Sequence, residues 1–289
     1  MLKFYLISTD HLEDRIWFKD DKDFVVAMNY VAVSTAANPR VLVICFILMS
    51  NHVHFVLSGD RAECEKFMWM FKQLYSSYLR HRYGISNFLH RNGLDVREVR
   101  VEDEGLKRAI AYVQMNCVAA RICLQPTQYA WGTGGCFFDD RKPIGTPIGS
   151  MSLRKRNTLL KSRKNIPADW VVSPGGYVLP ESYVQVKFVE SLFRTPASLE
   201  FFQQKSSKVR QMGEEEGGTS FRDQTISGAV ADYCYTTFQK RNLQELTEPE
   251  TRRLVREFRR RFSADVFQLA RVLGLPRDRI VGYLDDFQG

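Results

Sequence analysis

The stretch LMSNHVHFVL, residues 48–57, decides how the chain is expected to fold. It ends an apolar strand predicted over residues 41–48, turns at Ser50-Asn51, and starts a second strand over residues 52–58. Side chains alternate along a strand, so His52 and His54 project from one face and Val53 from the other. Two imidazoles on one face can share a divalent metal ion. The alternative is a pair of solvent-facing strand histidines, although the chain holds only five histidines in all.

The elements around this hairpin define the fold class. Two further strands are predicted over residues 3–9 and 96–101, and helices over residues 21–34, 62–83 and 102–120. Strand, helix, hairpin, helix, strand and helix in this order indicate an α+β fold. We therefore expect a ferredoxin-like antiparallel sheet with helices on one face.

The helix over residues 102–120 has two distinct faces. At about 100° per residue, one narrow stripe is apolar and is predicted to be buried; it consists of Leu106, Ile110, Val113 and Cys117. Tyr112 and Asn116 lie four residues apart on another stripe, together with Arg108, and residues at this spacing are neighbours on a helix. This face therefore offers a hydroxyl, an amide and a guanidinium group. The alternative is an ordinary polar helix face.

Three segments together resemble the single-tyrosine HUH-type transposases, in particular the REP-associated tyrosine transposase-like group. They are LMSNHVHFVL, AYVQMNCVAA at residues 111–120 and YAWGT at residues 129–133, and the resemblance covers about residues 1–135. It implies that His52 and His54 match the metal-binding histidines, that Asn116 matches the helix-borne ligand, and that Tyr112 matches the nucleophile. Ser50 and Cys117 stand at positions where the family often has proline.

The same resemblance implies a function. It implies a transposase or a host-retained relative that cleaves single-stranded DNA, transfers the strand through a 5′-phosphotyrosine intermediate and binds hairpin or palindromic DNA. It also implies Mg²⁺ or Mn²⁺ as the cofactor. The phenol of a free tyrosine has a pKa near 10 and needs assistance at neutral pH, and a bound ion would stabilise charge on the scissile phosphate. Tyr75, Tyr78 and Tyr83 on the preceding helix are rival nucleophiles, and Tyr78 is the most plausible of them.

Composition and charge limit the class of protein. A hydrophobic fraction of 44% and a charged fraction of 26% exclude a mainly disordered, collagen-like or coiled-coil chain. Lysine and arginine number 41 against 33 acidic residues, and the net charge of +8 favours an anionic partner without identifying it. Six scattered cysteines without a CxxC pair predict reduced, mostly buried thiols.

No signal peptide is recognised at the start, and the longest apolar run is far shorter than the roughly 20 residues that cross a bilayer. We therefore expect a soluble cytoplasmic protein with no membrane partner. The resemblance implies that it is bacterial and nucleoid-associated, and that it acts as a monomer or homodimer.

The chain is long enough for two or three domains. We expect a catalytic domain at residues 1–140, a basic linker and short helical region at 141–220, and a helical DNA-binding module at 221–289. Residues 206–220 are predicted to be a mobile linker. In the middle region, a run of six cations without an acid starts with three candidate DNA-binding residues, Arg154, Lys155 and Arg156.

The last module is predicted to combine an arginine-rich helix with a helix-turn-helix. Thr247 and Glu250 have the spacing of a capping box, and the helix that follows carries the candidate DNA-binding residues Arg252 and Arg253. Ser263 is expected to cap the next helix, and Gly274 to form the turn. Arg277 and Arg279 would begin the recognition helix. The alternative is a protein-interaction or dimerisation module with a solvated arginine face.

Two other functions compete with a transposase-type enzyme. One is a catalytically inactive DNA-binding regulator derived from a transposase, and the other is a replication-initiator or relaxase-type nuclease. The intact set of His52, His54, Tyr112 and Asn116 argues against the first. The second usually carries additional helicase or partner regions.

Overall fold

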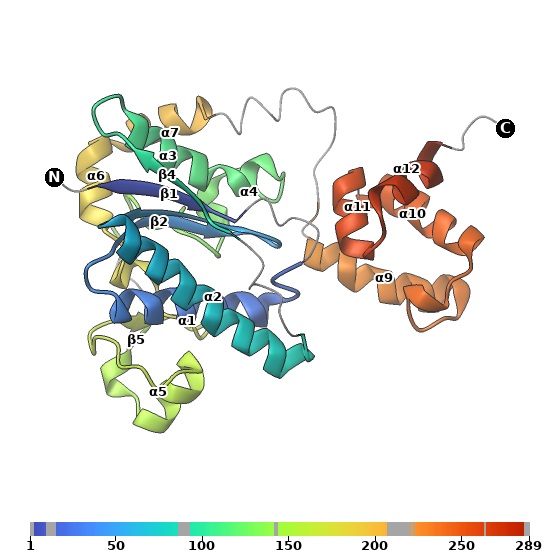
Figure 1. The fold of residues 1–289 in the computed structure, drawn as a ribbon, viewed down its shortest axis with the longest axis horizontal. Coiled ribbons are helices and arrows are strands. Elements are labelled where there is room, and N and C mark those ends of the chain that lie inside the picture. The colour runs from blue at the N-terminus through green and yellow to red at the C-terminus, as the bar shows by residue number, and fades with distance from the viewer. Residues whose placement is uncertain are drawn as a thin grey trace.

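A four-stranded antiparallel sheet organises the first part of the chain (Figure 1). The structure is a computed structural model, and it describes residues 3–9, 16–85, 93–141, 144–206, 221, 223–262 and 264–285. The strands are β1 (Phe4–Ser8), β2 (Leu42–Leu48), β3 (Val53–Ser58) and β4 (Asp95–Val99), in the spatial order β2-β3-β1-β4. All four strands expected from the sequence are therefore present, with ends shifted by one or two residues.

The strand with the histidines lies in the interior of this sheet. β3 pairs with β2 on one side and with β1 on the other, and His54 is opposite both Ile47 and Ser8. Every residue of β3 is buried, and so is nearly every residue of β2. A strand buried on both faces is apolar throughout rather than alternating, which explains the continuous apolar run in the sequence.

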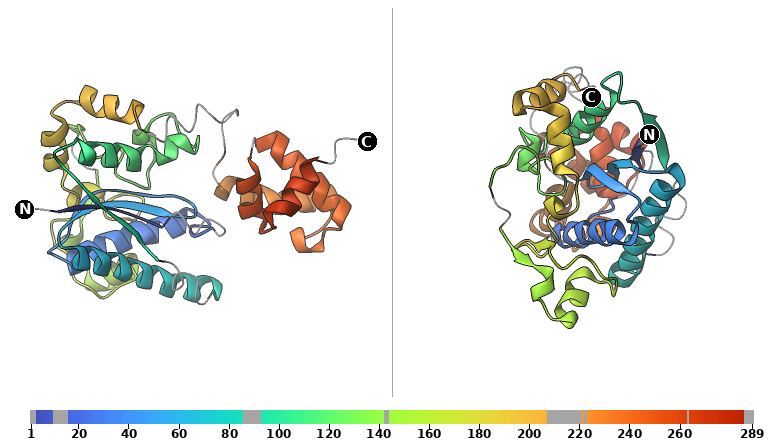
Figure 2. Two further views of the ribbon diagram at one scale, coloured as in Figure 1. Left: turned by 45° about the horizontal axis from the view of Figure 1, so that its top comes forward. Right: turned by 90° about the vertical axis from the view of Figure 1, so that its left-hand side faces the viewer.

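Helices cover both faces of the sheet, so the expectation of helices on one face is wrong. On one face, Phe55 of β3 contacts the rings of Phe67 and Phe71 on α2 (Arg61–Tyr83), with 5.8 Å between centroids in both cases. On the other face, His54 contacts Tyr112 on α3 (Gly105–Gln114). Figure 2 shows α1 (Asp21–Ala37) and α2 below the sheet and α3 above it. The reason is physical: a central strand that is apolar on both faces needs a cover on each.

Local signals set the ends of the first two helices. The side chain of Asp20 accepts a hydrogen bond from the Asp23 amide (3.0 Å) and caps α1. Gly84 ends α2 in the left-handed conformation at φ 67°, which glycine adopts without a steric penalty. Both helices are therefore confirmed, and their observed ends lie within three residues of the predicted ranges 21–34 and 62–83.

Residues 144–206 share the core of the sheet domain. Ile148, Val172 and Val189 are buried in the same cluster as the sheet residues, so the described part of the expected linker region is packed against the sheet. Its elements are β5 (Thr146–Pro147), α5 (Leu153–Leu160), β6 (Val171–Val172), α6 (Val186–Phe193) and α7 (Pro196–Gln204), with short 3-10 turns at Ile148–Ser150 and Pro180–Ser182. Another 3-10 turn precedes this region at Pro126–Gln128. Thr195 caps α7 and Pro196 opens it, as the sequence predicts.

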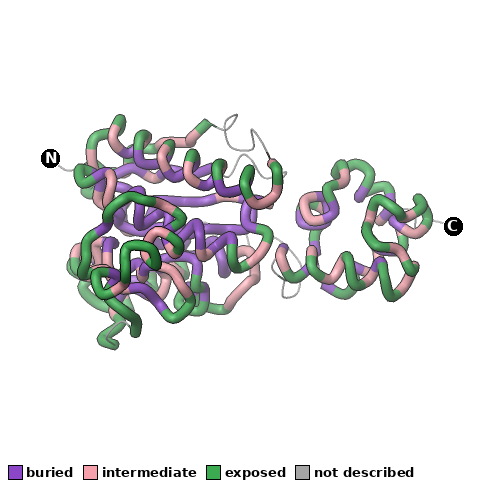
Figure 3. The backbone as a smooth tube through the Cα atoms, turned by 90° about the horizontal axis from the view of Figure 1, so that it is seen from below, coloured by how far each residue is buried: buried purple, intermediate pink, exposed green. Residues whose placement is uncertain are grey.

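The C-terminal helices form a core of their own (Figure 3). They are α9 (Asp223–Phe238), α10 (Glu248–Phe262), α11 (Val266–Leu273) and α12 (Arg277–Asp285), with a 3-10 turn at Leu243–Glu245. Gly274, at φ 65°, joins α11 to α12. Asp265 caps α11 through the Gln268 amide. The expected cap Ser263 and residues 207–220 of the expected linker lie outside the described residues.

Two general expectations can be compared with the structure. All six cysteines are free, and all but Cys123 are buried, which confirms the expected thiols. Among the residues that the structure describes, no helix has both the length and the apolar character needed to span a bilayer.

Candidate active site

The histidine pair lies at the start of β3, where the chain leaves a tight turn. The rings of His52 and His54 are 4.8 Å apart, centroid to centroid, at 82°. His54 is completely buried and His52 is half-buried. The two rings are therefore neighbours on one face of the sheet, as strand alternation predicts.

His52 is oriented by the residue before it. Its Nδ1 lies 3.0 Å from Oδ1 of Asn51, which can only accept, so the ring donates from Nδ1. In this tautomer the lone pair is on Nε2, the nitrogen that could ligate a metal ion. A ligand histidine usually donates its second N–H to an oxygen in this way. The sequence predicts Asn51 only as a turn residue; its position directly before the first histidine is the signal for this second role.

The backbone of the turn is held by distant segments. The carbonyl of Ser50 accepts hydrogen bonds from the amides of Trp17 (2.7 Å) and Phe18 (3.0 Å). Within the turn, the Met49 amide donates to the carbonyl of His52 (2.8 Å). Thr9 Oγ1 accepts from the amide of Val53 (3.0 Å). These bonds fix the position from which both imidazoles project.

The YAWGT segment supports the strand that leads into this turn. The Trp131 carbonyl accepts from the Leu48 amide, and the Tyr129 hydroxyl donates to the Leu48 carbonyl, both at 2.8 Å. Gly132 forms a bridge to Ile47, and a Cβ there would approach the Phe46 carbonyl oxygen to 2.9 Å. The segment therefore braces β2 along its backbone, and glycine is required for the close approach.

Replacing Tyr129 with phenylalanine should lower the free energy of unfolding by about 1–2 kcal/mol, because a buried hydrogen bond is lost. Urea denaturation followed by fluorescence measures the change. Tyr235→Phe is the control, since Tyr235 is 70% exposed. Equal stability of the two variants would show that the Tyr129 hydroxyl does not hold β2 in place.

Tyr112 faces the histidines from α3. Its ring meets the ring of His54 edge-on, with 5.4 Å between centroids and an angle of 85°. The predicted apolar stripe is completely buried: Leu106, Ile110 and Val113 lie on α3, and Cys117 lies just beyond its end. Packing of this stripe on β2 and β3 places the half-buried Tyr112 beside the histidine pair.

Asn116 lies where the helix is interrupted. A single helix was expected over residues 102–120, but α3 ends at Gln114 and α4 (Asn116–Ala119) follows after Met115. The amide nitrogen of Asn116 donates to the carbonyls of Tyr112 (2.8 Å) and Val113 (3.2 Å). Such side-chain bonds compete with the helical backbone bonds. Since the nitrogen is used in this way, the amide oxygen is the atom of Asn116 that could ligate a metal ion.

Arg108 lies one turn before Tyr112 on the same helix. Its guanidinium is 3.5 Å from the carboxylate of Glu104, and its side chain is 66% exposed. An exposed ion pair of this kind contributes little to stability. Arg108 therefore stands at the surface, one helical turn from Tyr112.

The rival tyrosines of α2 have structural partners. Tyr75 donates its hydroxyl proton to the Trp17 carbonyl (2.7 Å), and burial raises its pKa well above the usual value. Tyr78 donates to the buried carboxylate of Asp23 (2.8 Å), and burial followed by this bond raises its pKa. Burial and the charge of Asp23 likewise raise the pKa of Tyr83. A raised pKa makes phenolate scarcer, so these tyrosines are poorly suited to act as nucleophiles.

The candidate donors for a metal ion are the two imidazoles and the amide of Asn116. Within the residues that the structure describes, no three His, Cys, Asp or Glu side chains gather so that they could hold a metal ion. His52 and His54 would therefore need the oxygen of Asn116 as a third ligand. All three donors are neutral, so the site would keep the full positive charge of a divalent ion facing a phosphate. Of these donors, the amide oxygen is of the type that suits Mn²⁺ or Mg²⁺, whereas imidazole also ligates Zn²⁺ and other transition metals.

The basic candidates lie away from this cluster. Arg154 and Lys155 of α5 line a cavity that is formed with α1 and α2, on the side of the sheet opposite Tyr112, and Arg156 follows them on α5. Their proposed contact with DNA stays a prediction.

The C-terminal arginines have partners within their own module. In α10, Arg252 lies over the ring of Tyr283, and Arg253 over the ring of Phe238. At the start of α12, Arg277 lies 4.5 Å from the ring centre of Phe267. Arg279 donates to Glu248 and to the hydroxyl of Tyr283. A contact between Arg279 and DNA would therefore require it to exchange these partners.

The predicted cap of α10 is present. The Glu250 carboxylate accepts from the amide of Thr247 (2.7 Å), as the spacing of a capping box predicts. A hydrogen bond from Lys240, followed by those from Thr247, lowers the pKa of Glu250 to about 2. The cap therefore keeps its negative charge at neutral pH.

Comparisons with known proteins give one structural similarity. No protein-family model matches the chain, and no curated protein matches its sequence. Among solved structures, it is similar to a REP-associated tyrosine transposase bound to a REP hairpin, with a TM-score of 0.35 and 12% identity over 47% of this chain and 77% of that chain. A similarity of this size establishes no family, so the residues of the site carry the functional conclusion.

Proposed function

We propose that the chain is a metal-dependent single-stranded DNA endonuclease and strand transferase, a transposase or a host-retained relative of one, that acts through Tyr112. The observation that supports this most directly is the contact between the rings of Tyr112 and His54, 5.4 Å apart across two separate elements. A phenol beside two adjacent imidazoles combines a nucleophile with metal ligands. An ordinary polar helix face would not place its tyrosine against a buried histidine.

The proposed reaction exchanges one phosphodiester bond for another. The phenolic oxygen of Tyr112 forms a bond to phosphorus while the bond from phosphorus to the 3′ oxygen breaks. The phenol proton passes to solvent, and the departing oxygen takes up a proton to become a free 3′-hydroxyl. The fragment on the 3′ side of the break stays linked to Tyr112 through its 5′ phosphate, so a second 3′-hydroxyl can reverse the step and join a new strand without ATP.

His52, His54 and Asn116 would hold a Mg²⁺ or Mn²⁺ ion beside the scissile phosphate. Bound there, the ion would polarise the phosphate and stabilise its developing charge. The protein positions the groups: the turn at Ser50-Asn51 orients His52, and the core stripe of α3 holds Tyr112 against His54. Arg108, one turn from Tyr112, would attract the strand by its charge.

One experiment with end-labelled DNA tests the proposed cleavage and covalent attachment. The full chain is incubated with Mn²⁺ and a pool of hairpin oligonucleotides that carry a randomised single-stranded flank. A label at the 3′ end should remain with the protein after denaturation, and a label at the 5′ end should be released with a free 3′-hydroxyl. Binding without any adduct would instead identify the chain as a catalytically inactive DNA-binding regulator.

The C-terminal arginines should supply part of the affinity for duplex or hairpin DNA. Each phosphate that a protein neutralises contributes about 0.9 to the slope of log affinity against log salt. The double variant Arg252→Gln/Arg253→Gln should therefore bind hairpin DNA more weakly, with a slope about 1–2 shallower. Binding titrations at several salt concentrations measure both quantities.

Arg260→Gln is the matched control on the same helix, because Arg260 is paired with Glu257 at 2.9 Å. Its slope should stay close to that of the unaltered chain. If the double variant also keeps that slope, the arginine face does not contact DNA. A protein-interaction role would then be the better interpretation of this module.

A further inference from the structure

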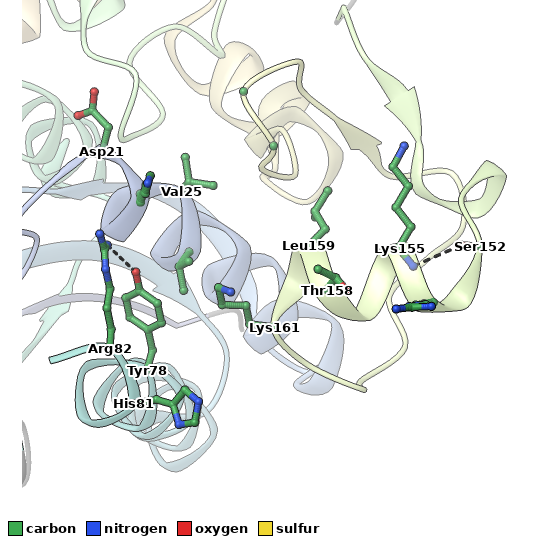
Figure 4. A pocket seen from close by; sticks show the side chains of 15 residues that line it. Asp21, Val25, Tyr78, His81, Arg82, Ser152, Lys155, Thr158, Leu159 and Lys161 are labelled. Atoms are coloured by element: carbon green, nitrogen blue, oxygen red, sulfur yellow. Dashed lines mark hydrogen bonds between the residues drawn. The ribbon is translucent and has the colours of Figure 1, made fainter. Parts of the chain in front are cut away.

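A cavity of about 1050 Å³ lies apart from the Tyr112 cluster, between α1, α2 and α5. Figure 4 shows Tyr78, His81 and Arg82 entering it from α2, with Thr158 and Leu159 facing them from α5. Neither histidine of the pair nor Tyr112 lines this cavity. Its volume is at the upper end of the roughly 300–1,000 Å³ that is typical of small-molecule sites.

The walls combine an apolar floor with a basic rim. Val25 and Val26 of α1, Leu159 of α5 and the ring of Tyr78 supply apolar surface. The cationic lining residues are Lys22, Arg82, Arg154, Lys155 and Lys161, and His81 also lines the cavity, whereas Asp21 is the sole acid in the lining. The cavity therefore favours a ligand that has both an apolar part and a negative charge.

Most of these cations are not neutralised by neighbouring acids. Arg82 is held by Asp20 and Asp23, each at 2.5 Å. Lys22, Arg154, Lys155 and Lys161, by contrast, form no ion pair with any acid that the structure describes. Like charges that converge on one cavity repel each other, and a bound anion would relieve this repulsion.

A buried amide makes the cavity rigid. Asn29 of α1 is completely buried and lies behind the lining. Its amide nitrogen donates to the carbonyls of Leu159 (3.2 Å) and Gly176 (3.0 Å), and its oxygen accepts from the Val178 amide (3.0 Å). One side chain thus fixes α5 and the turn at Gly176 to α1. A preformed site loses less conformational freedom when a ligand binds.

We propose that this cavity binds a phosphorylated nucleoside. The phosphate would lie at the basic rim, to which Lys155 and Lys161 contribute from opposite ends of α5 (Figure 4), and the base would lie on the apolar floor beside Leu159. Inorganic phosphate would leave that floor exposed to water, whereas a nucleotide would contact both the apolar floor and the basic rim. The ligand is either a free nucleotide or an unpaired nucleotide of a DNA strand, and neither requires cleavage at Tyr112.

Calorimetric titration of the full chain in EDTA tests this, because EDTA suppresses metal-dependent cleavage. The probes are dAMP, an unstructured (dT)8 strand, deoxyadenosine and inorganic phosphate. The charge variant is Lys155→Gln/Lys161→Gln, and Thr158→Trp fills the cavity from an exposed position without changing charge. Arg163→Gln/Lys164→Gln is the matched control, since these cations belong to the same run but do not line the cavity.

The charge variant and Thr158→Trp should each weaken binding of the nucleotide probe at least tenfold, and the control Arg163→Gln/Lys164→Gln should change it less than twofold. If dAMP shows this pattern, the ligand is a free nucleotide; if (dT)8 alone shows it, the ligand is a nucleotide of a strand. Equal losses in the charge variant and the control would indicate general attraction to basic surface and would overturn the proposal. Binding of inorganic phosphate as tight as dAMP, unaffected by Thr158→Trp, would overturn it as well, and so would the absence of binding by both dAMP and (dT)8.

Discussion

Tyr112→Phe should abolish the covalent DNA adduct, with a loss of more than about a thousandfold in cleavage, as expected when a nucleophile is removed. The substitution deletes one oxygen and keeps the ring that lies 5.4 Å from His54. The packing of α3 on the sheet should therefore be preserved, and so should affinity for DNA. Denaturing electrophoresis of a 3′-labelled oligonucleotide measures the adduct, and a binding titration measures the affinity.

Tyr78→Phe provides the comparison. Tyr78 was the strongest rival in the sequence, but its hydroxyl is bound to Asp23 and Arg82. Its loss should lower the melting temperature and leave the adduct in place. An adduct that persists in Tyr112→Phe and disappears in Tyr78→Phe would move the nucleophile to α2 and refute the proposed site.

His52→Ala and His54→Gln should each reduce cleavage by at least about a thousandfold, because charge stabilisation by a bound metal contributes several kcal/mol to catalysis. Binding of DNA should be largely retained, since the proposed phosphate contacts lie elsewhere on the chain. Glutamine is preferred at position 54 because His54 is completely buried and alanine would leave a void. His52 is half-buried, so alanine is acceptable there.

A metal-binding measurement tests the role of His52 and His54 separately from cleavage. Titration with Mn²⁺ in a calorimeter should show weaker binding in both variants, and excess EDTA should stop cleavage by the unaltered chain. His81→Ala is a matched control for metal binding only, because His81 is on α2 and lines the separate cavity rather than the cluster. Full cleavage by either site variant, or by the unaltered chain in EDTA, would contradict the metal assignment.

Much of the sheet domain could be predicted because its signals are local. The apolar runs of β2 and β3, the Ser50-Asn51 turn and Gly84 at the end of α2 depend on neighbouring residues alone. The break of the helix at Met115 could not be predicted in this way. It depends on the side chain of Asn116 bonding to the carbonyls of Tyr112 and Val113, and a residue pattern does not reveal which partner an amide selects.

The sequence by itself determined the strands, the shared face of His52 and His54, and the separation of Tyr112 from the apolar stripe of its helix. The periodicity of apolar residues and the turn-forming residues are sufficient to predict these features, since each feature follows from the geometry of a single element. Only the tertiary structure decided that helices cover both faces, that Tyr112 meets His54, and that α5 closes a basic cavity against α1 and α2. These depend on how separate apolar faces are buried against each other, and burial is a property of the packed chain rather than of any one segment.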